Sequence, residues 1–387
     1  MFTVATHPTA PRTGNIKPAM ERFDIQPVLS SSTTETANFL DRWHAQRNES
    51  SSPQQTIGQD SNSIEKRLHW LLIENPKATN APQHGFCIRN TSGVMVGLLL
   101  CFANTFLAED RRLLGLCSGS FFVDPSARPQ GFYLFKKYLR DPSYDIFFST
   151  TCNANSGPLW KAIGSSAVPN SEMEYILPLN LDVMLPALLA GKTSSSIATR
   201  IARVVGRMVG SIANPGRSRL PEFAVEPCQD WQKLSDLFRR HRPRSWITTD
   251  RSPGFLRWRY GPSSPNHPAE ICLFHDNQGN EGWFALADTI RGRHRQIHGA
   301  MLLDAVWPRD KIHFKQILPA ILCCQRVSTA DAVFFQPRLG VDYRECSRLI
   351  IPRKLEGPQS FAVARKGAAP VEVSSLDLVP ADGDSAF

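Results

Sequence analysis

The sequence lacks a long hydrophobic run. Its longest apolar stretch, residues 94–103, has ten residues and includes Gly97, which is about half the length that a membrane-spanning helix requires. The first thirty residues are polar and rich in Thr and Pro, unlike the apolar core of a secretory signal. We therefore expect a folded protein of the cytoplasm.

Local sets of metal ligands are also missing. The nine cysteines form no C-x-x-C pair, and the one pair of histidines at helical spacing, His294 and His298, lies in a segment that favours strand and loop. An odd number of cysteines scattered among apolar residues is typical of buried free thiols. We expect neither disulfides nor a metal cofactor.

No single region carries the positive charge of the chain. The net charge is +9, and the basic and acidic side chains number 16 and 15 in residues 1–180, 6 and 2 in residues 181–225, and 22 and 18 in residues 226–387. The excess is therefore densest in the short middle segment. This distribution argues against a wholly basic binding face, and an anionic partner is indicated for the middle segment alone.

Length and composition favour two globular domains. A chain of 387 residues exceeds the size at which single cores stop growing, and 42% hydrophobic with 20% charged residues is ordinary for a soluble fold. We expect a flexible N-terminus at 1–21, a first domain at 22–180, a connector at 181–222, a second domain at 223–365 and a flexible tail at 366–387. The sequence does not indicate the oligomeric state.

Four anchors recur in the same order in the two halves, as expected of duplicated units. Each half contains a Leu-x-Trp segment, a glycine turn, a strand ending in Val-x-Pro, and a strand ending in two phenylalanines. These anchors are Trp70, Gly93, Val123 to Pro125 and Phe147-Phe148 in the first half, and Trp258, Gly279, Val306 to Pro308 and Phe334-Phe335 in the second. The spacing from Trp to Val is 53 and 48 residues, and from Val to the last Phe 25 and 29. The halves therefore predict two related units.

Hydrophobic periodicity predicts alternating helices and strands in the first unit, and hence a mixed α/β fold. The expected helices are 34–48, 64–73, 131–139 and 158–163, and the expected strands are 86–89, 94–103, 113–123 and 146–150. Between the units, residues 197–212 place apolar side chains on one helical face and three arginines on the opposite face. That segment is interpreted as a connector packed on protein, with peripheral contact to an anionic membrane as the alternative.

The junction after the first Val-x-Pro element resembles the GNAT superfamily of acyltransferases. The segment Arg128-Pro129-Gln130-Gly131-Phe132 follows a strand that ends at Phe122 and Val123, and it matches the Arg and the first Gly of the superfamily's [Q/R]-x-x-G-x-[G/A] turn. A helix N-terminus binds a pyrophosphate through its free backbone N–H groups. The resemblance therefore implies an acyl-CoA site formed by these residues, with Phe122 and Val123 pairing the pantetheine arm.

The resemblance extends to a later element and has departures. Asn155 begins a helix and is implied to contact the pantetheine, although N-capping explains it equally well. Many members have a tyrosine as general acid four residues before the closing glycine, where this chain has Trp160, and an indole cannot donate that proton. Tyr133 stands where the motif has Gly or Ala, and Pro129 removes one backbone N–H.

The second unit has no glycine after its Val-x-Pro element, so it is not expected to bind a cofactor. It does contain Asp304 within an apolar strand. A buried carboxylate requires partners or has a function, and Asp304 is the candidate general base. The resemblance thus implies two tandem GNAT-like domains, of which the first binds acetyl-CoA or another acyl-CoA.

Three functions follow as alternatives. The paired units resemble bacterial acyltransferases of envelope polysaccharide synthesis, which implies acyl transfer to an amine or hydroxyl of a polar acceptor such as a sugar. A second alternative is an aminoacyl-tRNA-dependent transferase, in which the basic segment 239–259, interleaved with Trp246, Phe255 and Trp258, would contact RNA. The third is a scaffold that kept the fold without the chemistry.

Overall fold

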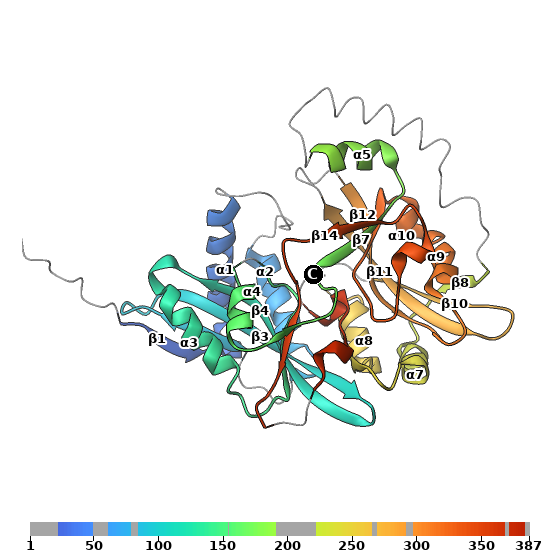
Figure 1. Ribbon diagram of the computed structural model, residues 1–387. Helices are drawn as coiled ribbons and strands as arrows, with labels where there is room; N and C mark the ends of the chain where they lie inside the picture. The colour runs from blue at the N-terminus through green and yellow to red at the C-terminus, as the bar shows by residue number, and fades with distance from the viewer. Residues whose placement is uncertain are drawn as a thin grey trace, which may run out of the picture.

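The protein folds as two mixed sheets with helices around and between them (Figure 1). The computed structural model describes residues 22–48, 61–78, 84–153, 155–190, 222–264, 269–291, 297–367 and 371–383. The predicted mixed α/β class is confirmed. The predicted connector helix at 197–212 and the N-terminal segment 1–21 lie outside the described residues.

The first sheet runs in the order β1-β2-β3-β4-β5-β15-β6, with β9 and β16 added beside β3. The bounds of its strands are β1 Asp24–Pro27, β2 Gly85–Arg89, β3 Met95–Ala108, β4 Arg111–Val123, β5 Ile146–Ser149, β6 Ser166–Ala167, β9 Ile247–Thr249, β15 Phe361–Ala364 and β16 Leu376–Asp377. The pairing of β4 with β5 is parallel, whereas the neighbouring pairs from β1 to β4 are antiparallel.

The second sheet repeats this layout in the order β8-β10-β11-β12-β13-β7-β14. The bounds of its strands are β7 Met173–Pro178, β8 Ala224–Pro227, β10 Glu270–His275, β11 Glu281–Arg291, β12 Ile297–Val306, β13 Ala332–Phe335 and β14 Ile351–Lys354. Its parallel pair is β12 with β13. The turns between β2 and β3 and between β10 and β11 each contain a glycine with positive φ, Gly93 (76°) and Gly279 (80°).

The helices have the following bounds: α1 Thr33–Asn48, α2 Ser61–Leu68, α3 Arg128–Tyr138, α4 Gly157–Ala162, α5 Leu181–Ala190, α7 Trp231–His241, α8 Pro253–Tyr260, α9 Phe314–Leu322, α10 Gln325–Ser328 and α11 Tyr343–Cys346. Shorter turns are η1 Ser30–Ser32, the π-helical η2 His69–Ile73, η4 Pro125–Ala127, η5 Val373–Ser375 and η6 Pro380–Asp382. No helix among the described residues is both long and apolar enough to span a bilayer.

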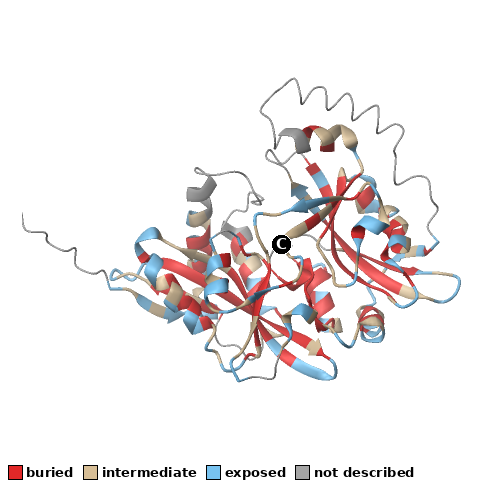
Figure 2. Cartoon of the chain, in the orientation of Figure 1, coloured by how far each residue is buried: buried red, intermediate tan, exposed pale blue. Residues whose placement is uncertain are grey.

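The central strands are buried on both faces, which explains their unbroken apolar sequences. Side chains alternate along β3, so Leu98, Leu100 and Phe102 belong to a core shared with the second sheet. Leu99 and Cys101 belong to a second core under α3 and α4. Figure 2 shows the buried residues along the strands of both sheets and in α8 between them. Helices α9 and α10 cover the other face of the second sheet.

Each sheet contains strands from both halves of the chain. Strand β7 precedes α5 in the chain but pairs with β13 of the second sheet, where Ala332 lies opposite Pro178. Strand β15 comes from the C-terminal half but pairs with β5 of the first sheet, where Phe361 lies opposite Ser149. Each sheet therefore includes at least one strand from outside its own predicted domain, 22–180 or 223–365.

The C-terminal segment corrects a prediction, because residues 371–383 are not a flexible tail. Strand β16 pairs in parallel with β9, and Leu376, Leu378 and Val379 are buried. A side chain at Gly383 would collide with the Thr150 hydroxyl oxygen, 1.5 Å away, directly after β5. Burial of these apolar side chains fixes the segment at the junction of the two sheets.

Two anchor tryptophans meet at this junction. The rings of Trp70 and Trp258 stack with centroids 4.6 Å apart. The Trp70 indole N–H donates to the Trp258 carbonyl (3.0 Å), and the Trp258 indole N–H donates to the Trp70 carbonyl (2.9 Å). The guanidinium of Arg259 lies over both rings and donates to the carbonyl of Gly383. These side chains hold the two halves together.

Candidate functional site

A fork opens in the first sheet where β4 and β5 part. The strands pair from Gly115 with Ile146 to Cys117 with Phe148, and no pair follows, although β4 continues to Val123. The Tyr138 hydroxyl of α3 lies at the fork, where it donates to the Leu116 carbonyl (2.6 Å) and accepts from the Phe148 N–H (3.2 Å). Burial raises the pKa of this phenol, which therefore stays neutral. The Tyr138 hydroxyl therefore bridges β4 and β5 by hydrogen bonds at the point where the two strands separate.

A β-bulge lies on β4 within the fork. Leu99 of β3 lies opposite Phe121 and Cys101 lies opposite Ser118, so Gly119 and Ser120 face the single residue between them. A bulge takes one residue out of the ladder and turns its backbone groups away from the partner strand. Backbone N–H and C=O groups of β4 on the side facing β5 are therefore available to a ligand within the fork.

Helix α3 begins at the open end of the fork. Its N-cap is Ala127, without a capping side chain, so Arg128 and Gln130 hold positions N1 and N3. Their N–H groups have no partner within α3, and Pro129 has no N–H. The Arg128 side chain is exposed. The start of α3 therefore places a helix N-terminus and a positive charge where an anion would bind.

Gly131 lies one turn inside α3, which begins three residues before the predicted start. As residue N4, its N–H lies in the regular ladder of α3 and is not free for a phosphate. A Cβ at this position would lie 3.3 Å from the Val123 side chain and 3.4 Å from the Phe121 ring. The absence of a side chain thus lets α3 pack closely on the end of β4.

The remaining predicted residues surround the fork. Phe122 packs against the Trp43 ring of α1, with centroids 5.4 Å apart. Phe132 is half-buried under the Lys136 ammonium, 4.7 Å from its ring centroid. Tyr133 points to solvent with 55% exposure, so its bulk does not crowd the start of α3.

Asn155 is exposed in the turn before α4, and the Asn153 side chain holds this turn. The Asn153 carbonyl oxygen Oδ1 accepts from the N–H groups of Asn155 (2.9 Å) and Ser156 (3.1 Å). Trp160 is 1% exposed and packs edge-on against Phe135, with centroids 5.0 Å apart. It is therefore a core residue of this unit.

The corresponding fork of the second sheet is filled. Strands β12 and β13 pair up to Met301 and Phe334, and Leu303 is the bulged residue on β12. The Arg338 guanidinium occupies the space beyond and donates to the Ala305 carbonyl (3.0 Å). At the start of α9, the Gln316 side chain accepts from the His313 N–H (2.9 Å). Neither feature has a counterpart in the first fork among the described residues.

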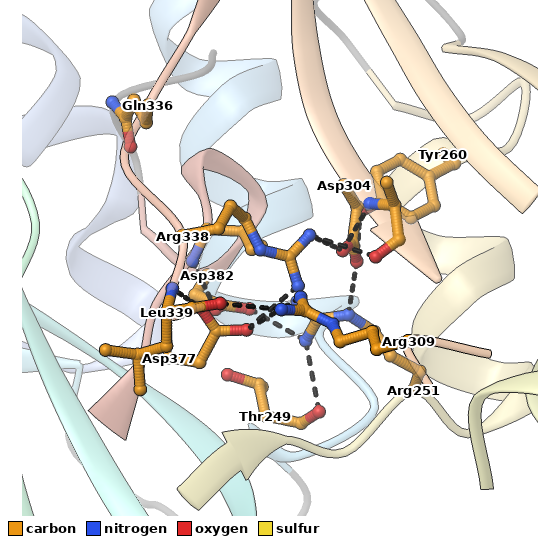
Figure 3. A network of polar contacts seen from close by, with 12 residues as sticks. Thr249, Arg251, Tyr260, Asp304, Arg309, Gln336, Arg338, Leu339, Asp377 and Asp382 are labelled. Carbon is orange, nitrogen blue, oxygen red and sulfur yellow. Dashed lines mark hydrogen bonds and ion pairs between the residues drawn. The ribbon is translucent and has the colours of Figure 1, made fainter. Parts of the chain in front are cut away.

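Asp304 lies at the centre of a buried ionic network (Figure 3). Its Oδ2 accepts from Arg251 Nε (2.6 Å) and the Tyr260 hydroxyl (3.2 Å). Its Oδ1 accepts from Arg338 (3.2 Å) and the N–H of Ala305 (2.8 Å). A carboxylate with four donors and 2% exposure has no lone pair facing a substrate. The geometry thus supports a structural role.

Two further carboxylates complete the network. Asp382 of η6 pairs with Arg251 (2.7 Å), and Asp377 of β16 pairs with Arg338 (2.9 Å). Burial alone would raise the pKa of Asp377, but the guanidinium groups of Arg338 and Arg309 hold it below the usual value. Burial lowers the pKa of Arg309 to about 10, and Arg338 adds to the effect. The network joins β12 of the second sheet to the C-terminal segment.

The basic segment 239–259 does not form an aromatic binding surface. Phe255 and Trp258 are buried in the shared core, and Trp246 covers Arg309, 4.5 Å from its ring centroid. A surface hollow of about 370 Å³ lies beside α7 and contains the ion pair of Lys233 with Glu281 (3.5 Å). Bases could not stack on the buried rings, so these contacts do not favour RNA.

Comparison with known proteins identifies the fold. No protein-family model matches the sequence, and no curated protein is similar to it. A probable N-acyltransferase of unknown function from Enterococcus faecalis V583 superposes with a TM-score of 0.55 at 10% identity, over 90% of this chain and 73% of that one. A GCN5-related N-acetyltransferase from Anabaena variabilis superposes with a TM-score of 0.51 at 11% identity, over 88% and 72%. The chain thus shares the GNAT fold of these proteins.

Proposed function

We propose that the protein transfers an acyl group, foremost acetyl, from acyl-CoA to an amine or hydroxyl of a polar acceptor. The observation that carries the proposal is the combination in one sheet of an open fork, a bulge on β4 and a helix start without a capping side chain. In the shared fold these three features lie next to one another. Acyl-CoA has the matching chemistry, namely a pyrophosphate, an amide-bearing arm and a thioester.

The binding mode follows from the groups at the fork. The start of α3, with the N–H groups of Arg128 and Gln130 and the Arg128 guanidinium, binds the pyrophosphate. The free edge of β4 at Phe122 and Val123 pairs with the pantetheine amides, as a peptide adds to a sheet edge. Asn155, exposed across the fork, is a further contact for the arm.

The bulge supplies the catalytic environment. A backbone N–H at Gly119 or Ser120 would stabilise the oxyanion that forms when the acceptor attacks the thioester carbonyl. The new C–N or C–O bond forms, the C–S bond breaks, and the proton lost by the acceptor ends on the departing CoA thiol. Trp160 supplies no acid and Asp304 no base, so the rate enhancement rests on positioning and on the oxyanion contact.

We propose a single cofactor site, in the first sheet. The fork of the second sheet already holds the Arg338 guanidinium, and Gln316 caps α9. A sugar is included among the acceptors because the paired units resemble enzymes of bacterial envelope polysaccharide synthesis. The units at 22–180 and 223–365, each lending a strand to the other sheet, are the duplicated domains of this proposal.

Charge reversal at the start of α3 tests the function. Arg128→Glu places a carboxylate beside the phosphates, and repulsion between solvated charges of about 1 to 2 kcal/mol should weaken binding by about tenfold or more. The matched control is Lys311→Glu, an exposed residue of the strand-to-helix connection in the second sheet, which should bind like the parent. Calorimetry with acetyl-CoA measures both affinity and stoichiometry. Equal affinity for the parent and Arg128→Glu, or two sites per chain, would contradict the proposal.

A further inference from the structure

Three metal-ligand donors meet on the face of the second sheet that α9 and α10 cover. Glu270 and Cys272 lie two residues apart on β10 and share a face of the strand. Cys324 follows α9, and its Sγ lies 3.5 Å from the Sγ of Cys272. One donor atom of each of the three residues lies within 4.8 Å of the others. No local spacing predicts this cluster, because the cysteines are 52 residues apart.

The sulfur separation suits a shared metal ion. Two thiolates at about 2.3 Å from a tetrahedral zinc ion are about 3.8 Å apart, close to the observed 3.5 Å. A disulfide would require about 2.05 Å, and both cysteines are free. The two thiols are buried, with exposures of 2% for Cys272 and 4% for Cys324. Such a pair needs only a small change in separation to hold the ion.

Arg326 orients the third donor. Its backbone N–H donates to Oε2 of Glu270 (3.2 Å), and its guanidinium lies 3.8 Å from the same atom. The other carboxylate oxygen, Oε1, is the one that faces Cys272, 3.9 Å from its Sγ. Glu270 keeps 19% side-chain exposure, which provides a route for an ion from solvent. Metal-binding carboxylates are commonly held in this way by an outer hydrogen bond.

Charge balance supports a divalent ion. Two thiolates and one carboxylate carry three negative charges, of which a divalent cation would balance two, and Arg326 lies near Glu270 while it also pairs with Asp288. The two thiols must lose their protons to solvent when they bind the cation, so metal binding at this cluster depends on pH.

We propose that Glu270, Cys272 and Cys324 bind one zinc ion, with water as the fourth ligand. Thiolate and carboxylate donors with three protein ligands suit zinc rather than magnesium or calcium, which take oxygen ligands alone. The ion would fasten the end of α9 to β10. It lies in the second sheet and takes no part in the proposed acyl transfer.

Cobalt substitution tests the site in the full-length reduced protein. We expect one Co²⁺ per chain, with a sulfur-to-cobalt charge-transfer band that zinc abolishes by displacement. Cys272→Ser and Cys324→Ser should lose the band, and Glu270→Gln, which keeps both thiols, should weaken cobalt binding by about tenfold or more. The control is Cys346→Ser, which removes a half-buried thiol of α11 and should retain both the band and the affinity.

Three results would overturn the site. One is the absence of a charge-transfer band in the folded, reduced parent. Another is an undiminished band in Cys272→Ser and Cys324→Ser that fold normally by circular dichroism. The third is a Cys272–Cys324 disulfide in the isolated protein, together with a failure to bind metal once this disulfide has been reduced. Because Arg128→Glu leaves this cluster intact, its cobalt binding should equal that of the parent whether or not the chain binds acyl-CoA.

Discussion

At the scale of single residues, Asp304 shows how a functional signal in a sequence becomes a structural role in the fold. An aspartate in an apolar strand indicates either partners or chemistry. Here its partners come from three elements remote in sequence, the loop after β9, helix α8 and the loop after β13. Arg251, Tyr260 and Arg338 could not be paired with it from sequence, because no local spacing relates them.

We predict that Asp304→Ala destabilises the protein by about 3 to 5 kcal/mol. The substitution removes the carboxylate that Arg251 and Arg338 share and leaves each with a single carboxylate partner, Asp382 and Asp377, and breaking a buried ionic network in this way is costly. Urea denaturation followed by tryptophan fluorescence measures the loss. The control is Asp236→Ala, whose exposed ion pair with Arg239 (3.7 Å) should contribute less than about 1 kcal/mol. An Asp304→Ala variant as stable as the parent would contradict this role.

The fork residues were easier to predict than the network. Phe122, Val123 and Arg128 lie where a Val-x-Pro strand end followed by a helix places them, since strand and helix periodicity are local properties. The start of the helix was harder to predict. The turn at Pro125–Ala127 leads directly into a helix that begins at Arg128 and not at residue 131, so Gly131 lies one turn inside α3.

At the scale of elements, the sheets depend on strands from both halves of the chain. Strands β9, β15 and β16 of the C-terminal half complete the first sheet, and β7 of the N-terminal half lies inside the second. Removing either half would expose unpaired strand edges and the apolar core that the sheets share. The exchange therefore makes the two units a single cooperative structure.

We predict that residues 1–190 do not fold when expressed alone, and that co-expression with residues 222–387 restores a soluble complex. The first fragment lacks the strand that pairs with β5, and the second lacks the strand between β13 and β14. Size-exclusion chromatography and circular dichroism of each fragment and of the pair test this. A folded monomer of residues 1–190 alone would show that the exchange is dispensable.

The helices and strands of the first unit were largely predictable from sequence. The expected strand 113–123 is β4 and the expected helix 34–48 is α1, each within two residues of the observed bounds. The exchange of β7 and β15 was not predictable, because a short apolar strand pairs equally well with either sheet until the tertiary contacts decide. The same reason explains the buried C-terminal segment, whose strand β16 has only two residues.

At the scale of the whole molecule, the two sheets share one order of seven strands and differ in what their forks contain. The first fork ends at a helix start that keeps backbone donors and an exposed arginine, and the second is closed by Arg338 and Gln316. The C-terminal half contributes three strands of the first sheet, most residues of the ionic network and the Trp258 contact. It thereby supports the unit in which we propose the cofactor site.

The central claim is that one acyl-CoA binds in the first fork and none in the second. Amide hydrogen exchange with and without saturating acetyl-CoA tests it directly, since ligand contact slows exchange where backbone groups become bonded or covered. We predict added protection within residues 118–131 and none within residues 302–317. Protection confined to residues 302–317, or unchanged exchange in both segments under conditions where the ligand binds, would contradict the account.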